Sequence, residues 1–99
     1  MEKLFDIGLT NYYKKFKEDK EYLEEFKSSI LEKYNSDDIE GLIFNFKKIN
    51  MEDIFLKNIF EAAFEITKLK LKFFVKNCDE SNLNYIKLLL NKYKIDSAN

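Results

Sequence analysis

Arginine, histidine, proline and tryptophan are all absent from this chain of 99 residues. Without histidine, the chain lacks the side chain whose ordinary pKa lies near neutral pH and which most often binds metals. Without arginine, it has no planar guanidinium group to bind a carboxylate or a phosphate through two parallel hydrogen bonds. These absences argue against an enzyme, and we predict no catalytic, cofactor-binding or metal-binding residues.

Cysteine and glycine are scarce. The single cysteine, Cys78, cannot form a disulfide within the chain. Its acidic neighbours Asp79 and Glu80 disfavour a reactive thiolate, so we expect a buried or half-buried thiol. The two glycines are Gly8 and Gly41, and with so few residues that interrupt helices, long helical segments are expected.

Long apolar runs are also missing. No stretch approaches eighteen uncharged apolar residues, so we expect no membrane span. The first residues lack the apolar segment of a signal peptide, which predicts a cytoplasmic protein or one delivered into a host cell. The dominance of Lys, Glu, Asn, Ile, Leu, Phe and Tyr indicates an AT-rich genome.

Charged and aromatic residues are plentiful, at 35% and 16% of the chain. This composition is typical of a folded domain, and the length predicts a single domain over residues 1–99 with residues 96–99 frayed. Residues 1–65 contain ten lysines and fifteen acids, whereas residues 66–99 contain seven lysines and three acids. The two halves of such a dipolar chain can neutralise each other within one fold, or the chain can dock onto a second copy or onto a partner of matching polarity.

Apolar residues recur at spacings of three, four and seven, as one face of a helix requires. The longest such stripe consists of Phe55, Ile59, Ala62, Ile66, Leu69 and Phe73. Asp19 and Ser36 are candidate helix N-caps. The sequence therefore predicts an all-α fold, a compact antiparallel bundle of four to five helices over residues 2–34 (with a break expected near 17–20), 36–48, 51–77 and 81–95.

One segment fits two structures. In residues 68–73, lysines alternate with Leu69, Leu71 and Phe73, which is the period of a half-buried strand, and residues 42–44 could pair with it. An isolated pair of strands is marginally stable in water, and the helical stripe passes through the same residues. We therefore assign a helix and keep the strand pairing as the alternative.

Three groups of residues are candidates for a contact surface. An acidic face could cover a basic cleft on a partner, and neighbouring aromatic residues can leave one ring exposed for a protein contact. Lysines near aromatic rings could instead bind nucleic acid. The acidic group is Glu18, Asp19, Glu21, Glu24 and Glu25; the aromatic group is Tyr12, Tyr13 and Phe74; the lysine group is Lys68, Lys70, Lys72 and Lys76.

The predicted function follows from these surfaces and from the missing chemical groups. We expect a small non-enzymatic protein-binding module that acts by occlusion, of the inhibitor, immunity-protein or antitoxin type, from phage or a mobile element. A protein is the expected partner, and a homo-oligomer is a further route to the same contacts. The alternative is a nucleic-acid-binding or assembly subunit of a larger complex that uses the lysine-rich segment 68–76.

Overall fold

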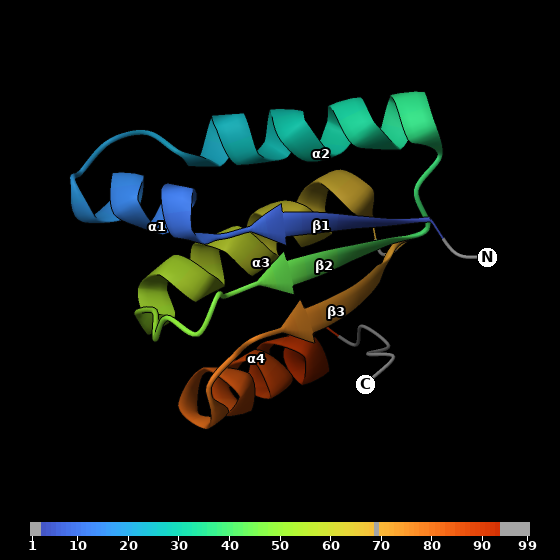
Figure 1. Cartoon of the computed structure of the whole chain (residues 1–99). Coiled ribbons are helices and arrows are strands. Elements are labelled where there is room, and N and C mark those ends of the chain that lie inside the picture. The colour runs from blue at the N-terminus through green and yellow to red at the C-terminus, as the bar shows by residue number, and fades with distance from the viewer. Residues whose placement is uncertain (1–2, 69, 94–99) are drawn as a thin grey trace.

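The computed structural model describes residues 3–68 and 70–93, and within them the chain forms three strands and four helices (Figure 1). Because strands alternate with helices, the predicted all-α antiparallel bundle is wrong and the fold is α/β. The elements in chain order are β1 (Leu4–Gly8), α1 (Thr10–Lys17), α2 (Leu23–Asp37), β2 (Gly41–Asn45), α3 (Asp53–Thr67), β3 (Lys72–Lys76) and α4 (Glu80–Lys92).

The strands form a parallel sheet in the order β1-β2-β3. Leu42 of β2 is level with Phe5 of β1 and with Phe73 of β3. Crossovers between parallel strands are right-handed, so in this sequential order both crossovers return along the same face of the sheet. Figure 1 shows α3 behind the sheet, with α2 along one side of α3 and α4 along the other.

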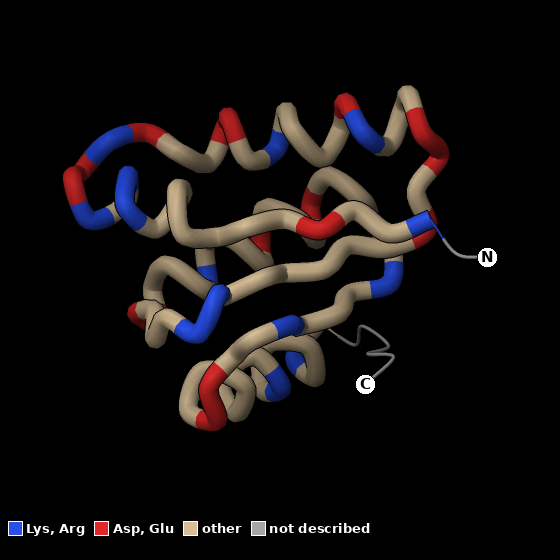
Figure 2. Tube along the Cα trace, viewed as in Figure 1, with Lys and Arg blue, Asp and Glu red and all other residues tan. Residues whose placement is uncertain are grey.

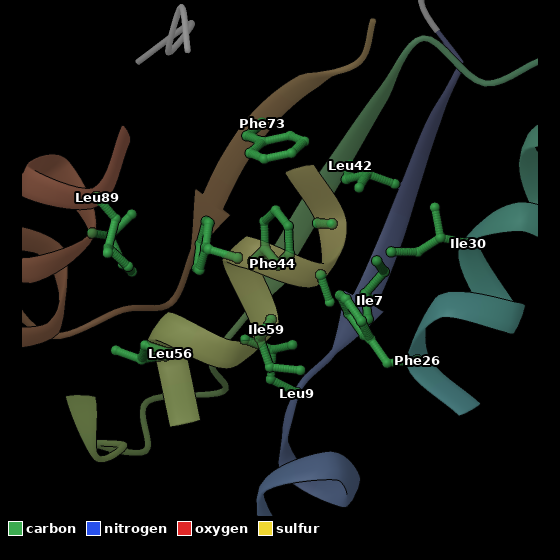
Figure 3. Packing of buried hydrophobic residues seen from close by; sticks show 14 of the residues in the cluster. Ile7, Leu9, Phe26, Ile30, Leu42, Phe44, Leu56, Ile59, Phe73 and Leu89 are labelled. Atoms are coloured by element: carbon green, nitrogen blue, oxygen red, sulfur yellow. The ribbon is translucent and has the colours of Figure 1, made fainter. Parts of the chain in front are cut away.

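Phe44, the fourth of the five residues of β2, lies at the centre of the hydrophobic core. The centroid of its ring lies 4.3 Å from that of Phe60 on α3 and 5.3 Å from that of Phe73 on β3. Phe26 of α2 approaches the same ring from the other side, at 6.5 Å. Figure 3 shows the strand side chains and the helix side chains meeting between the two layers. Since each buried ring removes about 150–250 Å² from water, this cluster supplies a large share of the hydrophobic stabilisation.

The predicted helix over 51–77 is a helix followed by a strand. α3 ends at Thr67, and Lys68 follows in the left-handed region with φ of 49°. In β3, Phe73 is buried against the helices while Lys72 is exposed on the other side, which explains the period of two. Residues 42–44 pair with residues 73–75, whereas the alternative prediction placed the partner strand over 68–73, of which β3 includes residues 72 and 73. β1 adds the further strand that a two-stranded pairing needs for stability.

The predicted helix over 36–48 is also wrong. Ser36, the expected cap, lies in the last turn of α2, and Asp38 ends that helix in a left-handed conformation. Residues 41–45 form the central strand, in which Leu42 and Phe44 are fully buried and Ile43 lies on the opposite face. A central strand of a parallel sheet carries apolar residues at consecutive positions. Such a run also fits the apolar face of a helix, so periodicity alone does not distinguish the two.

The predicted helix over 2–34 contains a strand and two helices. β1 occupies residues 4–8 and is followed directly by α1. α1 ends at Lys17 and α2 begins at Leu23, on either side of the expected break. Asp19 lies in the connecting turn with φ of 57°, and Tyr22, not Asp19, holds the N-cap position of α2.

A buried asparagine fixes the start of α4 to the loop before α3. Asn82, 2% exposed, accepts a hydrogen bond from the Met51 N–H and donates one to the Met51 carbonyl, both at 2.8 Å. Asp79 caps α4 by accepting from the Asn82 N–H at 2.9 Å. α4 covers most of the predicted range 81–95, whose end lies, like residues 96–99, outside the described residues.

Candidate functional site

None of the described helices packs against the second face of the sheet, which faces the viewer in Figure 1. Strand alternation places on this face the residues that lie between the buried ones. Parallel sheets normally carry helices on both faces, so an uncovered face is unusual. We call the residues on it the open face; the register aligns them in three rows, Leu4 with Gly41 and Lys72, Asp6 with Ile43 and Phe74, and Gly8 with Asn45 and Lys76.

Gly41 lets two larger side chains approach each other across the open face. A Cβ atom at Gly41 would lie 2.9 Å from Leu4 Cδ2 and 3.2 Å from Phe74 Cε2, so both side chains lean over the glycine. Ile43 stands beside them on β2 and is half-buried, as Phe74 is, while Leu4 is 39% exposed. Leu4, Ile43 and Phe74 thus form an apolar ridge across the amino-terminal half of the face.

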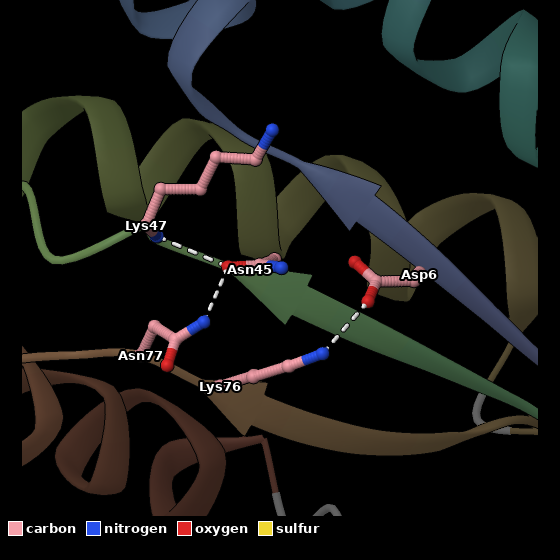
Figure 4. A network of polar contacts seen from close by, with 5 residues as sticks. All are labelled: Asp6, Asn45, Lys47, Lys76 and Asn77. Carbon is pink, nitrogen blue, oxygen red and sulfur yellow. Dashed lines mark hydrogen bonds and ion pairs between the residues drawn. The ribbon is translucent and has the colours of Figure 1, made fainter.

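The carboxyl-terminal end of the open face is polar. Asn45 is 8% exposed, and its Oδ1 accepts hydrogen bonds from the Lys47 N–H at 3.0 Å and from Asn77 Nδ2 at 3.3 Å (Figure 4). Lys47 has φ of 51°, and its Cε would lie 3.4 Å from a Cβ at Gly8. The two asparagines therefore hold the turn that directs the Lys47 side chain over β1.

Lysines outnumber acids on this surface. Asp6 is the one acid among the open-face residues, and its Oδ2 lies 3.5 Å from Lys76 Nζ (Figure 4). Both side chains are exposed, so the ion pair contributes little to stability, although it offsets one lysine charge. Lys72 lies on the same face and Lys47 reaches over it from the turn after β2, so the charged residues beside the apolar ridge are three lysines and Asp6.

The lysines predicted to bind nucleic acid do not form one surface. Lys72 and Lys76 lie on the open face, on either side of Phe74. Lys68 and Lys70 instead border a hollow of about 140 Å³ near the carboxyl-terminal ends of α2 and α3. The segment 68–76 therefore contributes to two different surfaces.

The predicted acidic contact residues lie around the turn between α1 and α2. Figure 2 shows both signs of charge along this part of the chain. Three of the acids form ion pairs with lysines, in the pairs Lys15–Glu25, Lys20–Glu18 and Lys27–Glu24. Asp19 and Glu21 line a shallow hollow that also includes Lys20. The structure thus brings the five acids close together, but lysines interrupt the acidic surface.

Among the predicted aromatic contact residues, Phe74 lies on the open face and the two tyrosines pack against the core. Tyr12 meets Phe26 edge-on, with ring centroids 5.5 Å apart. The Tyr13 ring lies 5.0 Å from that of Phe55, and its hydroxyl donates to Glu52 at 3.2 Å. The core thus uses both members of the Tyr12–Tyr13 pair.

Cys78 follows β3 and is half-buried, as expected. Burial is the main cause that raises the pKa of the Cys78 thiol to about 11, and the negative charge of Asp79 adds to it. Because the thiolate is the nucleophile, such a thiol is unreactive near neutral pH. In the described part of the chain, no group of three or more Cys, Asp or Glu side chains is placed to hold a metal ion.

Comparison of the chain with protein-family models, with curated proteins and with solved structures finds no match. Across residues 3–68 and 70–93, none of the helices has the length and apolar character needed to cross a bilayer. The functional interpretation therefore depends on the geometry of this chain.

Most of the open face cannot be predicted from helical periodicity. That periodicity assigns four of its residues to helices: Leu4, Asp6, Ile43 and Asn45. Two signals in the sequence point to the face. The alternation of lysines with apolar residues before Phe74 indicates a strand with one solvated side. Gly41 within an apolar run indicates a place where neighbouring strands bring side chains close together.

Replacing Gly41 tests the close contact on this face. We expect Gly41→Ala to destabilise the fold by about 1–3 kcal/mol, because the new Cβ would also lie 3.0 Å from the Lys72 carbonyl oxygen, which belongs to the backbone and cannot rotate away. The matched variant Gly8→Ala meets only the flexible Lys47 side chain, and we expect it to be neutral or stabilising by up to about 1 kcal/mol. Urea unfolding of both variants measures the difference, and equal effects would contradict the geometry.

The raised pKa of Cys78 predicts slow alkylation. At pH 8 the thiolate fraction is about one in a thousand, and the higher intrinsic nucleophilicity of a basic thiolate recovers part of the rate, so iodoacetamide should react about tenfold more slowly than with free cysteine. The rate should keep rising up to about pH 11. Asp79→Asn, which keeps a helix-capping side chain, should accelerate the reaction by removing the like charge. Reaction as fast as that of free cysteine would rule out the assigned environment.

Proposed function

We propose that this chain is a non-enzymatic protein-binding module that acts by covering a surface of its partner, and that the open face makes the contact. The observation that carries this proposal is the apolar ridge of Leu4, Ile43 and Phe74 on a parallel sheet that the described helices cover on one side. Apolar side chains grouped on an otherwise solvated face favour a protein contact. A partner would supply the second layer that parallel sheets normally have.

A contact surface without reacting groups suits occlusion. An inhibitor, an immunity protein or an antitoxin acts by blocking a surface, and such a role needs shape and charge complementarity but no reacting groups. The thiol of Cys78, with its raised pKa, is poorly suited to nucleophilic chemistry. We therefore place this chain among small binding modules of that type, encoded by phage or by a mobile element.

Nucleic-acid binding is the second candidate, because Lys72, Lys76 and Lys47 share a face with an aromatic residue. Lysines neutralise phosphates, and aromatic rings stack bases. Two of the three ridge residues are aliphatic, however, and the ring of Phe74 leans over Gly41. The ridge therefore favours a protein partner over a nucleic acid.

Ile43 provides the test of the proposed contact surface. Tagged wild-type protein purified from its native host should retain a partner, and Ile43→Asp should reduce the retained amount at least tenfold, because it puts a charge at the centre of the apolar ridge. Leu88→Asp is the matched control: Leu88 is 68% exposed on α4, in the helical layer, and the variant should retain the partner as the wild type does.

Leu4→Asp serves as a second variant, since Leu4 lies at the edge of the sheet, where a charge perturbs folding less. Circular dichroism establishes which variants are folded. Equal retention of the partner by all folded variants would overturn the open face as the contact surface, and so would a wild-type protein that retains nothing.

A further inference from the structure

Asn45 has one donor group without a protein partner, at the carboxyl-terminal end of the open face. The residue is 8% exposed, and its Oδ1 accepts hydrogen bonds from the Lys47 N–H and from Asn77 Nδ2. Because a backbone N–H can only donate, the bond from Lys47 fixes which end of the Asn45 amide is the oxygen. Nδ2 therefore points away from these two partners (Figure 4), and within residues 3–68 and 70–93 nothing accepts a hydrogen bond from it.

This nitrogen is nevertheless within reach of a ligand. In the described part of the chain, no side-chain nitrogen or oxygen is both fully buried and unpartnered, so Asn45 Nδ2 touches solvent. An almost buried amide whose nitrogen donates to no protein group is uncommon in a folded protein. Such a nitrogen indicates an acceptor that comes from outside the chain.

Lys47 directs an ammonium group to the same place. Its Nζ lies 3.6 Å from the position that a Cβ atom would take at Gly8. Gly8 is level with Asn45 in the register of the sheet, about 4.8 Å away across the two strands. The Lys47 ammonium group and the Asn45 amide nitrogen therefore border one small space above Gly8. No acid of the described residues forms an ion pair with Lys47.

Gly8 keeps this space open. Its φ is not positive, so the backbone conformation does not require glycine at this position. A side chain larger than alanine would fill the space that the Lys47 ammonium group borders. The space also lies at the carboxyl-terminal end of parallel strands, the end at which open α/β sheets bind their ligands.

A carboxylate matches the two donors better than a phosphate does. Asp6 is the one acid among the open-face residues, and Lys76 Nζ at 3.5 Å offsets its charge. A carboxylate brings two oxygens and one negative charge to one amide donor and one ammonium group. A phosphate group brings three terminal oxygens and up to two charges, so it needs more donors and is repelled more strongly by Asp6.

We infer that the space above Gly8 binds a carboxylate of the partner protein, with one oxygen accepting from Asn45 Nδ2 and the other from Lys47 Nζ. This inference rests on the proposed function and deepens it by naming a chemical group of the partner. Ile43 of the apolar ridge lies two residues before Asn45 on the same strand, about 7 Å away. The carboxylate should therefore stand next to an apolar side chain of the partner, either at a chain end or on an Asp or Glu.

The test is a titration with N-acetyl-leucine, which carries a carboxylate next to an apolar side chain, followed by NMR of the side-chain amide groups at neutral pH and constant ionic strength. The matched probe N-acetyl-leucinamide has the same shape without the charge. The Asn45 side-chain NH₂ signals, identified by their loss in Asn45→Asp, should shift with the carboxylate. The amide should bind at least about tenfold more weakly, because the charge-assisted hydrogen bonds are lost.

Two variants remove one donor each. Lys47→Met keeps the apolar stem, and Asn45→Asp keeps an oxygen that accepts from the Lys47 N–H and from Asn77. Both should weaken the binding of N-acetyl-leucine at least about tenfold. Lys87→Met removes the same charge from an exposed position on α4, in the helical layer, and it should stay within about twofold of the wild type. Circular dichroism establishes that the variants are folded.

A second carboxylate probe distinguishes the two sources. N-acetyl-Leu-Glu amide has a side-chain carboxylate and no terminal one, so the tighter of the two carboxylate probes shows whether the partner offers a chain end or an acidic side chain. Three results would overturn the inference: equal binding of the leucine carboxylate and its amide, affinities that Lys47→Met and Asn45→Asp leave unchanged, or inorganic phosphate that binds through Lys47 more tightly than either carboxylate.

Failure of this inference is separable from failure of the proposed function. If the native partner is lost from Ile43→Asp while neither carboxylate probe binds, the open face is the contact surface but the carboxylate site is wrong. If Ile43→Asp and Lys47→Met both retain the native partner, the contact surface itself is wrong, and the inference fails with it.

Discussion

Burial on one side of the parallel sheet determines the rest of this structure. The Phe44 ring packs against the rings of Phe60 and Phe73, with centroids 4.3 and 5.3 Å away, so the central strand and its crossover helix form a single core. The sequential strand order then brings both right-handed crossovers to that face. Ile43, next to Phe44, points to the other side, where none of the described helices lies. An apolar residue in the middle of a parallel sheet is therefore left half-exposed, and this constraint gives the molecule its candidate contact surface.

The distribution of charge follows from the same arrangement. The edge strand β3 carries Lys72 and Lys76 on the open side, where both are exposed, and buries Phe73 on the other side. Lysines on an edge strand also disfavour pairing with the strand of another chain. The open face thus combines a small apolar ridge with three lysines and one acid, Asp6. The mixed charges around the α1–α2 turn form a separate and more neutral surface.

Part of the fold is predictable from the sequence, and the reason for the rest lies in particular residues. α3 lies within a predicted helix and α4 overlaps most of another, because each has one apolar stripe and a solvated face. β2 is not predictable in this way, because Leu42, Ile43 and Phe44 are consecutive apolar residues and periodicity cannot distinguish a buried strand from a buried helix. The alternation around Lys72 does indicate β3, but a pair of strands is marginal alone, and helical periodicity assigns the residues of β1 to the helix predicted over 2–34. The site is harder to predict, since Leu4, Ile43 and Phe74 meet only through the register of the sheet.

The central claim is that neighbouring residues of β2 face opposite environments. Methyl NMR in the presence of a soluble nitroxide tests it directly, because the nitroxide broadens the signals of methyl groups that solvent can reach. The account predicts strong broadening for the methyl groups of Leu4 and Ile43, and sharp signals for Leu42 and Ile59, which are both fully buried. Equal broadening of Leu42 and Ile43, or protection of both, would contradict a sheet that is covered on one face and open on the other.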